Sequence, residues 1–470
     1  MGGGIGSMSA PDILAIGRGS IVAPAGCGKT ESIVRAVARN DGKPALVLTH
    51  TNAGVCALRS RMVRAKVATT KPRVTTLDGW CLQLVSSYPE LSGLRPDLSA
   101  IQYPALREAA IRAVSSGALD AILRASYSRV IVDEYQDCTS PQHRLVVALA
   151  DRLPCCVLGD PLQRIFDWAG PLPDWDAEVL TTFPLVATLD DPWRWIAEGE
   201  EDFGRWILSI GGGLERGQGV DLTTAPVNLV WKKAVDEEQQ KSAEAEAMAE
   251  LAGLAPSTAL IVGSSLDAAS RVEFAKTYDG VQVVERADMP ELAAAADKIG
   301  SEKELKRVIE VLRFARTVMS GIDKAFVDRL NDLASGREAP AEDSERIFLT
   351  ARHGATFGNL ARMLECWHKT PGWFVYRPDL LNVMMDGMRR TAEDGDLKAS
   401  VLEVREAKRS KGRHIPALGI GSTLLLKGLE AERVIILDAG SMNACNAYVA
   451  LSRASRSVTV ISKNPVIGLV

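Results

Sequence analysis

Short apolar runs alternate with amphipathic stretches over the first 160 or so residues of the chain. Four of these runs have the length and composition of buried strands, at residues 20–23, 45–48, 130–132 and 155–158. Helical patterns separate them, and in residues 31–37 the apolar positions recur at helical spacing. Strands that alternate with helices predict a parallel sheet with helices on both faces.

The pattern starts again after about residue 185. Residues 300–400 are mostly helical in pattern, as in 302–317 and 360–367, and an acidic, alanine-rich stretch at 236–250 also favours a helix. Strand-like runs occur at residues 259–262, 281–284, 423–426, 434–437 and 458–461. The chain therefore predicts an α/β fold with a second α/β unit that a helical insertion interrupts.

Composition narrows the class of protein only slightly. The 470 residues are enough for about three domains, and 55 Lys and Arg stand against 59 Asp and Glu, so net charge alone does not indicate nucleic acid. The eight Cys contain no CxxC pair and the five His are dispersed, which favours free thiols over a zinc site. No apolar run reaches membrane-spanning length and no signal-peptide pattern opens the chain, so we expect a cytoplasmic protein without a membrane partner.

A glycine-rich turn between a strand and a helix carries the first chemical motif, which reads APAGCGKT from Ala23 to Thr30. Glycines in such a turn let backbone N–H groups approach phosphates, Lys29 can reach the β and γ phosphates, and the Thr30 hydroxyl can hold Mg²⁺. Ala23 stands where the usual pattern has its first glycine. The predicted nucleotide contacts are Ala25, Gly26, Cys27, Gly28, Lys29, Thr30 and Glu31.

A second motif is acidic. The apolar run 130–132 ends in Asp133 and Glu134, which places two carboxylates at the carboxyl end of a strand. Asp133 would bind Mg²⁺, and Glu134 would orient or deprotonate the attacking water. An acidic strand end that caps a loop is the structural alternative, but the position about 100 residues after a phosphate loop favours catalysis.

The sequence DEYQD at residues 133–137 resembles the DExQD motif of superfamily 1 helicases of the UvrD, Rep and PcrA type. Six further motifs resemble those of this family and follow in its order: THTN (49–52), TTLD (75–78), GDPLQRIFDW (159–168), PWR (192–194), KGLE (427–430) and YVALSRA (448–454). Together with the phosphate loop they span residues 23 to 454. The resemblance implies a superfamily 1A DNA helicase built from two RecA-like P-loop domains with parallel sheets and short, mostly helical insertions.

The resemblance also implies domain boundaries. Domain 1A would cover residues 1–185, with a helical insertion 1B at about 80–126. Domain 2A would comprise residues 186–300 and 415–470, and a reduced, 2B-like helical insertion would occupy residues 301–414.

For the ATPase site, the resemblance implies the cofactors ATP and Mg²⁺. Gln163 would sense the γ-phosphate, and Arg194 and Arg453 would supply the arginine fingers that stabilise the charge of phosphoryl transfer. We expect both arginines in the second α/β unit, so that ATP would lie between the first and the second α/β unit. The remaining implied nucleotide contacts are Trp193, which replaces the family's Tyr as a partner of the adenine, Gly428, and Glu430, which could contact the ribose.

For DNA, the resemblance implies a single-stranded partner and the contact residues His50, Thr51, Asn52, Thr76, Trp168, Ser422 and Lys427. Trp168 would stack on a base, and its structural alternative is a core Trp. Two groups of basic residues could contact DNA phosphates or could be solvated helix ends, and the two interpretations carry about equal weight. They are Arg405, Lys408, Arg409, Lys411 and Arg413, and Arg59, Arg61, Arg64, Lys66, Lys71 and Arg73.

The chain departs from the family at several positions. No Gln precedes the phosphate loop, so the adenine-reading Q motif is absent and nucleotide selectivity is open. No Arg follows Trp168, Leu424 replaces a common His, Ser422 replaces Thr, and His50 replaces a stacking Phe. The phosphate-handling residues are retained, and we therefore expect hydrolysis to be retained.

Two functions are open at this point. The first is an ATP-dependent 3′ to 5′ DNA helicase or translocase, with polarity implied by the resemblance. The second is a nucleic-acid-sensing regulatory ATPase subunit that gates a partner nuclease. The compact layout is similar to the helicase subunit of the Gabija anti-phage system, which implies an OLD-type nuclease or another defence or repair protein as partner. A GTPase switch is disfavoured because the chain has no NKxD motif.

Overall fold

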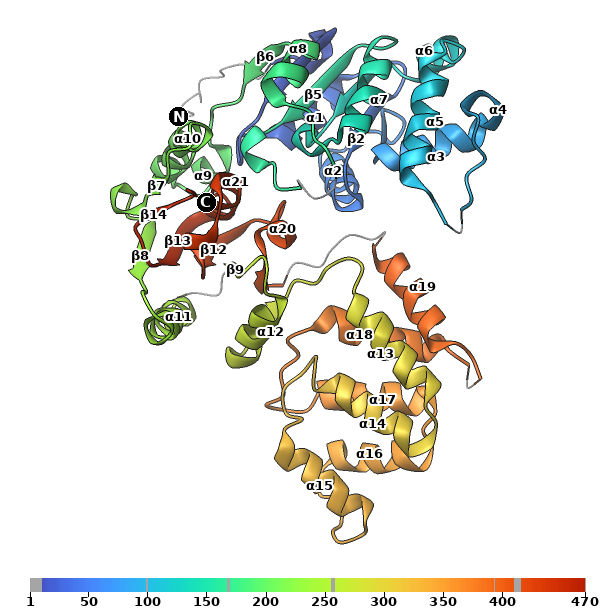
Figure 1. The fold of residues 1–470 in the computed structure, drawn as a ribbon, viewed down its shortest axis with the longest axis vertical. Coiled ribbons are helices and arrows are strands. Elements are labelled where there is room, and N and C mark those ends of the chain that lie inside the picture. The colour runs from blue at the N-terminus through green and yellow to red at the C-terminus, as the bar shows by residue number, and fades with distance from the viewer. Residues whose placement is uncertain are drawn as a thin grey trace. The chain divides into compact units, whose positions relative to one another are not determined.

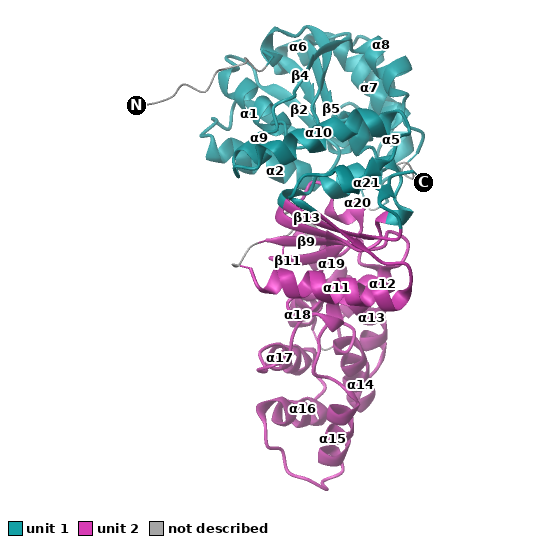
Figure 2. Ribbon diagram, turned by 90° about the vertical axis from the view of Figure 1, so that its left-hand side faces the viewer, with its two compact units in different colours: residues 1–229, 440–456, 464–470 teal, residues 230–439, 457–463 magenta. Residues whose placement is uncertain are grey.

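The structure is a computed structural model, and it describes residues 11–98, 100–166, 170–254, 258–392, 394–409 and 416–469. The chain forms two compact units, which Figure 2 shows in different colours. Unit 1 comprises Met1–Leu229, Gly440–Arg456 and Asn464–Val470, and unit 2 comprises Val230–Ala439 and Ser457–Lys463.

Unit 1 is built on a six-stranded sheet in which every neighbouring pair of strands is parallel. Its strands, in spatial order, are β3 (Pro72–Thr76), β2 (Ala45–Thr49), β4 (Arg129–Val132), β5 (Cys155–Gly159), β1 (Arg18–Val22) and β6 (Leu185–Thr188). Because the strands are parallel, all of them end at one edge of the sheet, which we call its carboxyl edge. The loops at this edge are the usual place for ligand sites in open α/β sheets.

Helices cover both faces of this sheet (Figure 1). Val47 and Ile131 belong to a core shared with α1 (Lys29–Arg39) and α2 (Asn52–Arg64). Their chain neighbours Leu46 and Val130 belong to a second core with α3 (Leu77–Ser87), α5 (Tyr103–Ser115) and α7 (Ser140–Ala150). Strands buried on both faces are apolar without interruption, which is why short apolar runs predicted them.

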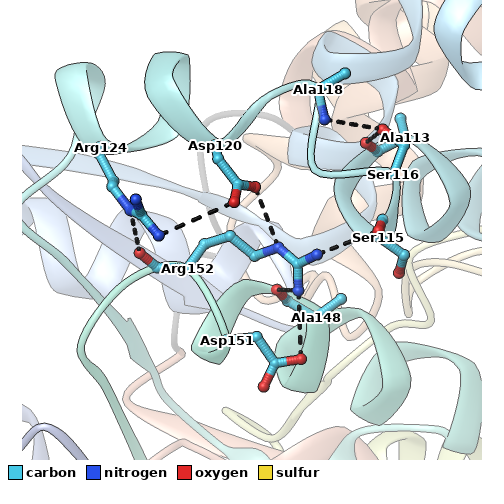
Figure 3. Close-up of polar contacts among 9 residues, drawn as sticks. All are labelled: Ala113, Ser115, Ser116, Ala118, Asp120, Arg124, Ala148, Asp151 and Arg152. Atoms are coloured by element: carbon cyan, nitrogen blue, oxygen red, sulfur yellow. Dashed lines mark hydrogen bonds and ion pairs between the residues drawn. The ribbon is translucent and has the colours of Figure 1, made fainter.

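The segment between β3 and β4 is helical, with α4 (Pro89–Ser92) and α6 (Asp120–Ser126) beside α3 and α5. Arg152, which follows α7, ties this segment to the rest of unit 1 (Figure 3). Its guanidinium donates to Asp120 Oδ1 at 3.3 Å, to the Ser115 carbonyl at 3.2 Å and to the Ala148 carbonyl at 3.2 Å. One side chain therefore joins the ends of α5, α6 and α7.

Unit 1 also contains a short helix just before β6, segments that follow β6, and segments from near the end of the chain. These elements are α8 (Leu180–Thr182), α9 (Trp193–Ile196), α10 (Glu201–Glu215), β7 (Val220–Asp221), α21 (Ala444–Leu451) and β14 (Val466–Ile467). β7 and β14 pair antiparallel, and α21 contacts α10 and the 3-10 turn η3 (Pro161–Gln163). Residues nearly 300 positions apart thus meet in one unit.

The second sheet also has six strands. In spatial order they are β10 (Gln282–Val283), β11 (Leu418–Gly421), β9 (Ala259–Val262), β12 (Ala431–Ile436), β13 (Ala454–Ser462) and β8 (Leu229–Lys233). β9 pairs in parallel with β11 and β12, and β10 pairs in parallel with β11. Side chains of α11 (Glu237–Ala252) and α12 (Ala268–Thr277) share a core with this sheet.

Between β10 and β11 the chain forms a helical part of unit 2 with its own core, which includes Trp367 and Met384. Its helices are α13 (Pro290–Ser301), α14 (Glu304–Ala315), α15 (Lys324–Ala334), α16 (Asp343–His353), α17 (Phe357–His368), α18 (Pro378–Arg390) and α19 (Leu397–Arg409).

The α/β fold class with two large sheets and mostly helical insertions is confirmed, in an arrangement consistent with two RecA-like domains. The domain boundaries remain predictions. None of the helices in the described part of the chain is long and apolar enough to cross a membrane.

One predicted strand is wrong. Residues 423–426 form a short helix, α20 (Thr423–Leu426), rather than a strand. The Ser422 side chain caps this helix by accepting a hydrogen bond from Leu425 N at 3.4 Å. The strand of this region is β11, immediately before it, whose two glycines weaken the strand pattern in the sequence.

A buried ion pair joins the helical part of unit 2 to the second sheet. Glu285 follows β10 and Arg377 precedes α18, and the guanidinium binds both carboxylate oxygens, at 2.6 and 3.0 Å. A further Arg377 nitrogen binds Glu291 at 2.6 Å. Next to this pair, Val283 N donates to the Tyr376 carbonyl at 2.8 Å. Because both charges are buried, each depends on the other for stabilisation.

Removal of the Arg377 guanidinium should therefore destabilise unit 2. We expect Arg377→Ala to lower the free energy of unfolding by about 3–5 kcal/mol, because it removes the guanidinium that binds both oxygens of the buried Glu285 carboxylate. Urea denaturation measures this change. Arg389→Ala, which removes a more exposed pair with Glu365, is the control and should cost under about 1 kcal/mol. An equally small decrease in the free energy of unfolding in both variants would contradict the structural role of the buried pair.

Candidate nucleotide-binding site

The glycine-rich turn lies at the carboxyl edge of the first sheet, between the end of β1 and the start of α1. Gly26 and Gly28 have φ values of 76° and 84°, a left-handed conformation that glycine adopts without strain. A Cβ atom on Gly26 would lie 2.5 Å from the Trp195 ring, so a side chain has no room there. The turn thus has the backbone shape and the close packing of a phosphate-binding loop.

Lys29 begins α1 and points at the acidic motif. Its Nζ atom lies 3.1 Å from Asp133 Oδ1 and 2.5 Å from Glu134 Oε1, and its side chain is only 10% exposed. Burial favours the neutral amine, but the two carboxylates outweigh this effect and raise the pKa of Lys29. The group is therefore an ammonium ion held among carboxylates, at the position where a phosphate chain would compete for it.

The residues of the turn fit a nucleotide triphosphate with Mg²⁺. Thr30, in the first turn of α1, is half-buried, and Asp133 follows the end of β4 at the same edge of the sheet. A hydroxyl and a carboxylate are hard oxygen ligands of the kind that Mg²⁺ prefers. Cys27 is buried, and burial raises the pKa of its thiol to about 12, so it stays protonated. Glu31 is exposed and pairs with Arg35 at 3.1 Å.

Glu134 adopts a strained backbone conformation, with φ at 55°. Left-handed conformations of this kind cost a non-glycine residue about 1–3 kcal/mol and occur mainly at functional sites. The conformation brings the Glu134 carboxylate to Lys29 on one side and to Gln136 on the other, where Gln136 Nε2 donates to Glu134 Oε2 at 2.5 Å.

Gln136 links the acidic motif to the turn after β5. Its Oε1 atom accepts from Asp160 N at 3.0 Å, and Asp160 Oδ2 accepts from Gln163 Nε2 at 2.7 Å. Asp160 is buried, and burial raises the pKa of its carboxyl group to about 6 despite the hydrogen bond from Gln163. Hydrogen bonds through Gln136 and through the backbone and side chain of Asp160 thus connect Glu134 to Gln163.

Arg453 completes this chain of contacts. Its guanidinium donates to Gln163 Oε1 at 3.5 Å, and it also donates to the Val449 carbonyl at 2.9 Å and to Ser452 Oγ at 3.0 Å. The residue is 2% exposed. Arg453 therefore belongs to unit 1, beside the residue predicted to sense the γ-phosphate, and it immediately precedes β13 of the second sheet.

The segment at α9 packs directly on the glycine-rich turn. Arg194 N donates to the Gly26 carbonyl at 3.1 Å, the Arg194 guanidinium donates to the Ser452 carbonyl, and Trp195 Nε1 donates to the Ala454 carbonyl at 2.9 Å. Arg194 thus also lies in unit 1, and its guanidinium reaches the residue next to Arg453 in the chain. Nearby, Ala25 N donates to the Tyr448 hydroxyl at 3.3 Å.

Trp193 is 45% exposed and borders the turn, since its Cδ1 atom would lie 3.3 Å from a Cβ built on Gly28. A large aromatic ring exposed beside a phosphate loop is free to stack on a planar base.

The predicted DNA contacts of unit 1 lie at the carboxyl edge of neighbouring strands, because β2 and β3 pair with Thr49 opposite Thr76. Thr51 and Thr76 cap α2 and α3, each accepting a helix N–H at 3.0 Å. Their hydroxyl protons remain able to donate to a phosphate oxygen. Asn52 is exposed and His50 is half-buried.

Four other residues predicted to contact DNA or nucleotide belong to unit 2 rather than unit 1. Ser422, Lys427, Gly428 and Glu430 belong to unit 2, around α20, where Gly428 and Glu430 are exposed and Ser422 is the helix cap. Trp168 lies outside the described residues.

The basic group that ends α19 is partly engaged within unit 2. Arg405 pairs with Glu406 at 2.8 Å, and Lys408 pairs with Asp386 at 3.3 Å. These pairs favour a solvated helix end. Lys411 and Arg413 of the same group lie outside the described residues.

Sequence reasoning gave no role to four side chains that build the site: Gln136, Asp160, Trp195 and Tyr448. Gln136 and Asp160 occupy defined positions of the DExQD motif and of the motif at residues 159–168, so these motifs could have pointed to both residues. Trp195 carried none, because its contact with the glycine-rich turn depends on how α9 folds back onto that turn.

Comparison with known proteins gives a partial match. The model of the family described as UvrD/REP helicase N-terminal domain matches residues 110–175, which include the acidic motif, Asp160 and Gln163. This match supports a UvrD-like helicase. No curated protein matches the sequence.

Many solved structures match the chain, and one of them aligns with most of it. It is the complex structure of Arterivirus nonstructural protein 10 (helicase) with DNA, at 9% identity and a TM-score of 0.33. The alignment covers 96% of this chain, which spans 61% of that one. A likeness at this level does not bear on function.

The close approach of Trp195 to Gly26 is testable. We expect Gly26→Ala to destabilise the protein by at least about 2 kcal/mol and to weaken binding of a fluorescent ATP analogue more than tenfold, because the left-handed backbone and the indole ring both exclude a Cβ. Thermal unfolding and fluorescence titration measure the two effects. Gly17→Ala, where a Cβ meets nothing within 4 Å, is the control. Wild-type affinity in the Gly26 variant would show that the turn is not a tight phosphate loop.

Proposed function

We propose that this chain is an ATP-dependent DNA helicase or translocase of the UvrD-like type, which couples ATP hydrolysis to movement on single-stranded DNA. The observation that carries the proposal is the chain of contacts that joins Lys29, Glu134, Gln136, Asp160, Gln163 and Arg453. It connects a phosphate loop, an acidic pair, a sensor amide and a buried arginine, which are the groups that phosphoryl transfer requires.

In this proposal each group has one role. Backbone N–H groups from Ala25 to Thr30 hold the phosphates of ATP, Lys29 moves from its carboxylates to the β and γ phosphates, and Trp193 stacks on the adenine. Thr30 and Asp133 hold Mg²⁺, which when bound neutralises charge on the β and γ oxygens. Glu134 then orients and deprotonates the attacking water.

Arg194 and Arg453 act on the charge that develops at the γ-phosphate. Each is anchored through its neighbours, Arg194 by the backbone bond to Gly26 and Arg453 by the bonds to Val449 and Ser452. Preorganised cations of this kind stabilise a transition state without reorganising at the moment of reaction.

Coupling to movement follows from the position of Arg453 in the chain. It contacts Gln163 in unit 1 and immediately precedes β13, whose later residues belong to unit 2. A change in the Gln163–Arg453 contact on hydrolysis would therefore be transmitted covalently to the second sheet. Conformational steps of this type commonly set the turnover of such enzymes.

DNA contacts come from the carboxyl edge of the first sheet and from unit 2. Thr51, Asn52 and Thr76 would bind phosphates, and His50 would stack on a base. Trp168, Ser422 and Lys427 would extend this path, and the 3′ to 5′ polarity is taken from the family resemblance. The adjacent placement of β2 and β3 supports a continuous backbone site from Thr51 to Thr76.

A second candidate is a regulatory ATPase that senses nucleic acid and gates a partner nuclease, as in anti-phage defence or repair. The small size of the helical segment between β3 and β4 favours it, since α3 to α6 fill only residues 77–126. The two candidates share the ATPase site and differ in whether the isolated chain unwinds a duplex.

Two substitutions test the ATPase site. Lys29→Ala should abolish hydrolysis, because it removes the ammonium group that Asp133 and Glu134 hold beside the glycine-rich turn. Arg453→Ala should lower kcat by a factor of about 10³ or more while nucleotide affinity is largely retained. Steady-state phosphate release measures both.

Arg456→Ala is the matched control, because Arg456 lies three residues away and pairs with Glu198 at the surface. It should keep the wild-type turnover. Unchanged turnover in Arg453→Ala would contradict the role of the arginine finger.

A further inference from the structure

A stretch of the first α/β unit has an excess of positive charge. The 36 residues between Asp41 and Asp78 contain no acidic side chain, although the whole chain has a net charge of -4. The same stretch contains seven basic residues, namely Lys43, Arg59, Arg61, Arg64, Lys66, Lys71 and Arg73. The proposed function uses none of them.

The fold gathers most of this charge at the amino edge of the first sheet, where its parallel strands begin. α2 starts at Asn52, at the carboxyl edge, and its 13 residues end at Arg64. A helix of this length spans about 20 Å, so its last turn lies well away from the proposed single-strand contacts. Lys66 and Lys71 follow in the connection to β3, and Arg73 lies at the start of β3, the edge strand of the sheet.

Little of this charge is neutralised. In the described part of the chain, one ion pair engages this group, between Lys71 and Asp41 at 3.2 Å. Arg59 donates instead to the Val74 carbonyl at 2.8 Å, and Arg73 to Gln83 Oε1 at 2.6 Å. Uncharged partners position these guanidinium groups but leave their charges in place. Arg64 and Lys66 are exposed to solvent.

An open hollow of about 610 Å³ adjoins these residues. It lies at the starts of β2 and β3, and the polar side chains on its walls are Thr69, Thr70, Arg73, Gln83 and Tyr127. Arginine, hydroxyl, amide and phenol groups are the side chains that contact phosphate oxygens in protein–DNA complexes. The hollow and the charge excess are separate observations that point to the same kind of ligand.

We propose that this surface, the amino-edge site, binds the phosphate backbone of duplex DNA that flanks the single strand. The inference rests on the proposed function, because it assumes a DNA substrate. The single strand is placed at the opposite edge of the sheet, one helix length away. Duplex DNA is stiff over about 50 nm, so a duplex that adjoins the bound strand extends as a straight, highly charged rod.

The chemistry of the amino-edge site suits a duplex better than a second single strand. Unpaired strands bind chiefly by stacking on aromatic side chains, whereas duplex binding without sequence preference depends on cations and hydroxyls. The site offers one aromatic residue, Tyr127, beside several cations.

The test compares a DNA duplex carrying a single-stranded tail with the tail alone. The full-length triple variant Arg64→Gln, Lys66→Gln, Arg73→Gln removes three charges. The matched control removes three exposed charges from the helical part of unit 2, in Lys303→Gln, Lys306→Gln and Lys324→Gln. Fluorescence anisotropy gives the affinity for each DNA over a series of salt concentrations.

We expect the wild type to bind the tailed duplex more tightly than the tail. In the triple variant, the affinity for the tailed duplex should fall roughly 100-fold at moderate salt, and the slope of log affinity against log salt should become less steep by about 2.7, for three lost phosphate contacts. Affinity for the tail, and the ATPase rate that the tail supports, should stay at the wild-type level in both variants.

Other outcomes overturn the proposal. A triple variant with an unchanged salt slope on the tailed duplex would show that the cations do not contact DNA and would leave an acidic protein as their partner. Equal loss on the tail alone would place the single strand on this surface. A wild type that binds neither DNA would instead refute the proposed function, which separates the two failures.

Discussion

The ammonium group of Lys29 determines how the rest of the candidate site is arranged. It is buried between Asp133 and Glu134, and a buried cation is stable only with partners at close range. To provide the second partner, Glu134 takes a left-handed backbone that costs about 1–3 kcal/mol. The same backbone directs Gln136 toward Asp160. A nucleotide that draws Lys29 away would thus release Glu134 at the position where a catalytic base is needed.

The parallel sheet explains why these groups meet although they are far apart in the sequence. β1, β4 and β5 end at one edge, so the phosphate loop, the acidic pair and the Asp160–Gln163 turn follow three neighbouring strands. α9 and α21 add Arg194 and Arg453 from segments about 260 residues apart. The opposite edge of the sheet carries unneutralised cations instead. One sheet therefore separates phosphoryl chemistry from the proposed duplex contact.

Local sequence was sufficient for the motifs and for the four inner strands of the first sheet, but it did not predict the edge strands β3 and β6, most of whose residues are not buried. Buried parallel strands are apolar without interruption, and the glycines of a phosphate loop have no common structural substitute. Local sequence was insufficient where tertiary contacts determine the conformation. Residues 423–426 are apolar enough for a strand but follow a helix-capping serine, and the packing of Trp195 on Gly26 depends on a chain reversal that no local pattern encodes. Arg194 and Arg453 were expected in the second unit because sequence order does not show that α9 and α21 fold back onto unit 1.

A DNA motor requires an ATPase site that responds to DNA. The most direct measurement is the steady-state rate of ATP hydrolysis by the full chain, with saturating single-stranded DNA, with RNA and with neither. The network from Glu134 to Arg453 predicts a slow basal rate that single-stranded DNA raises at least about tenfold, which corresponds to about 1.4 kcal/mol of transition-state stabilisation. A rate that is the same with DNA, with RNA and without either would contradict a nucleic-acid motor and leave only an ATPase.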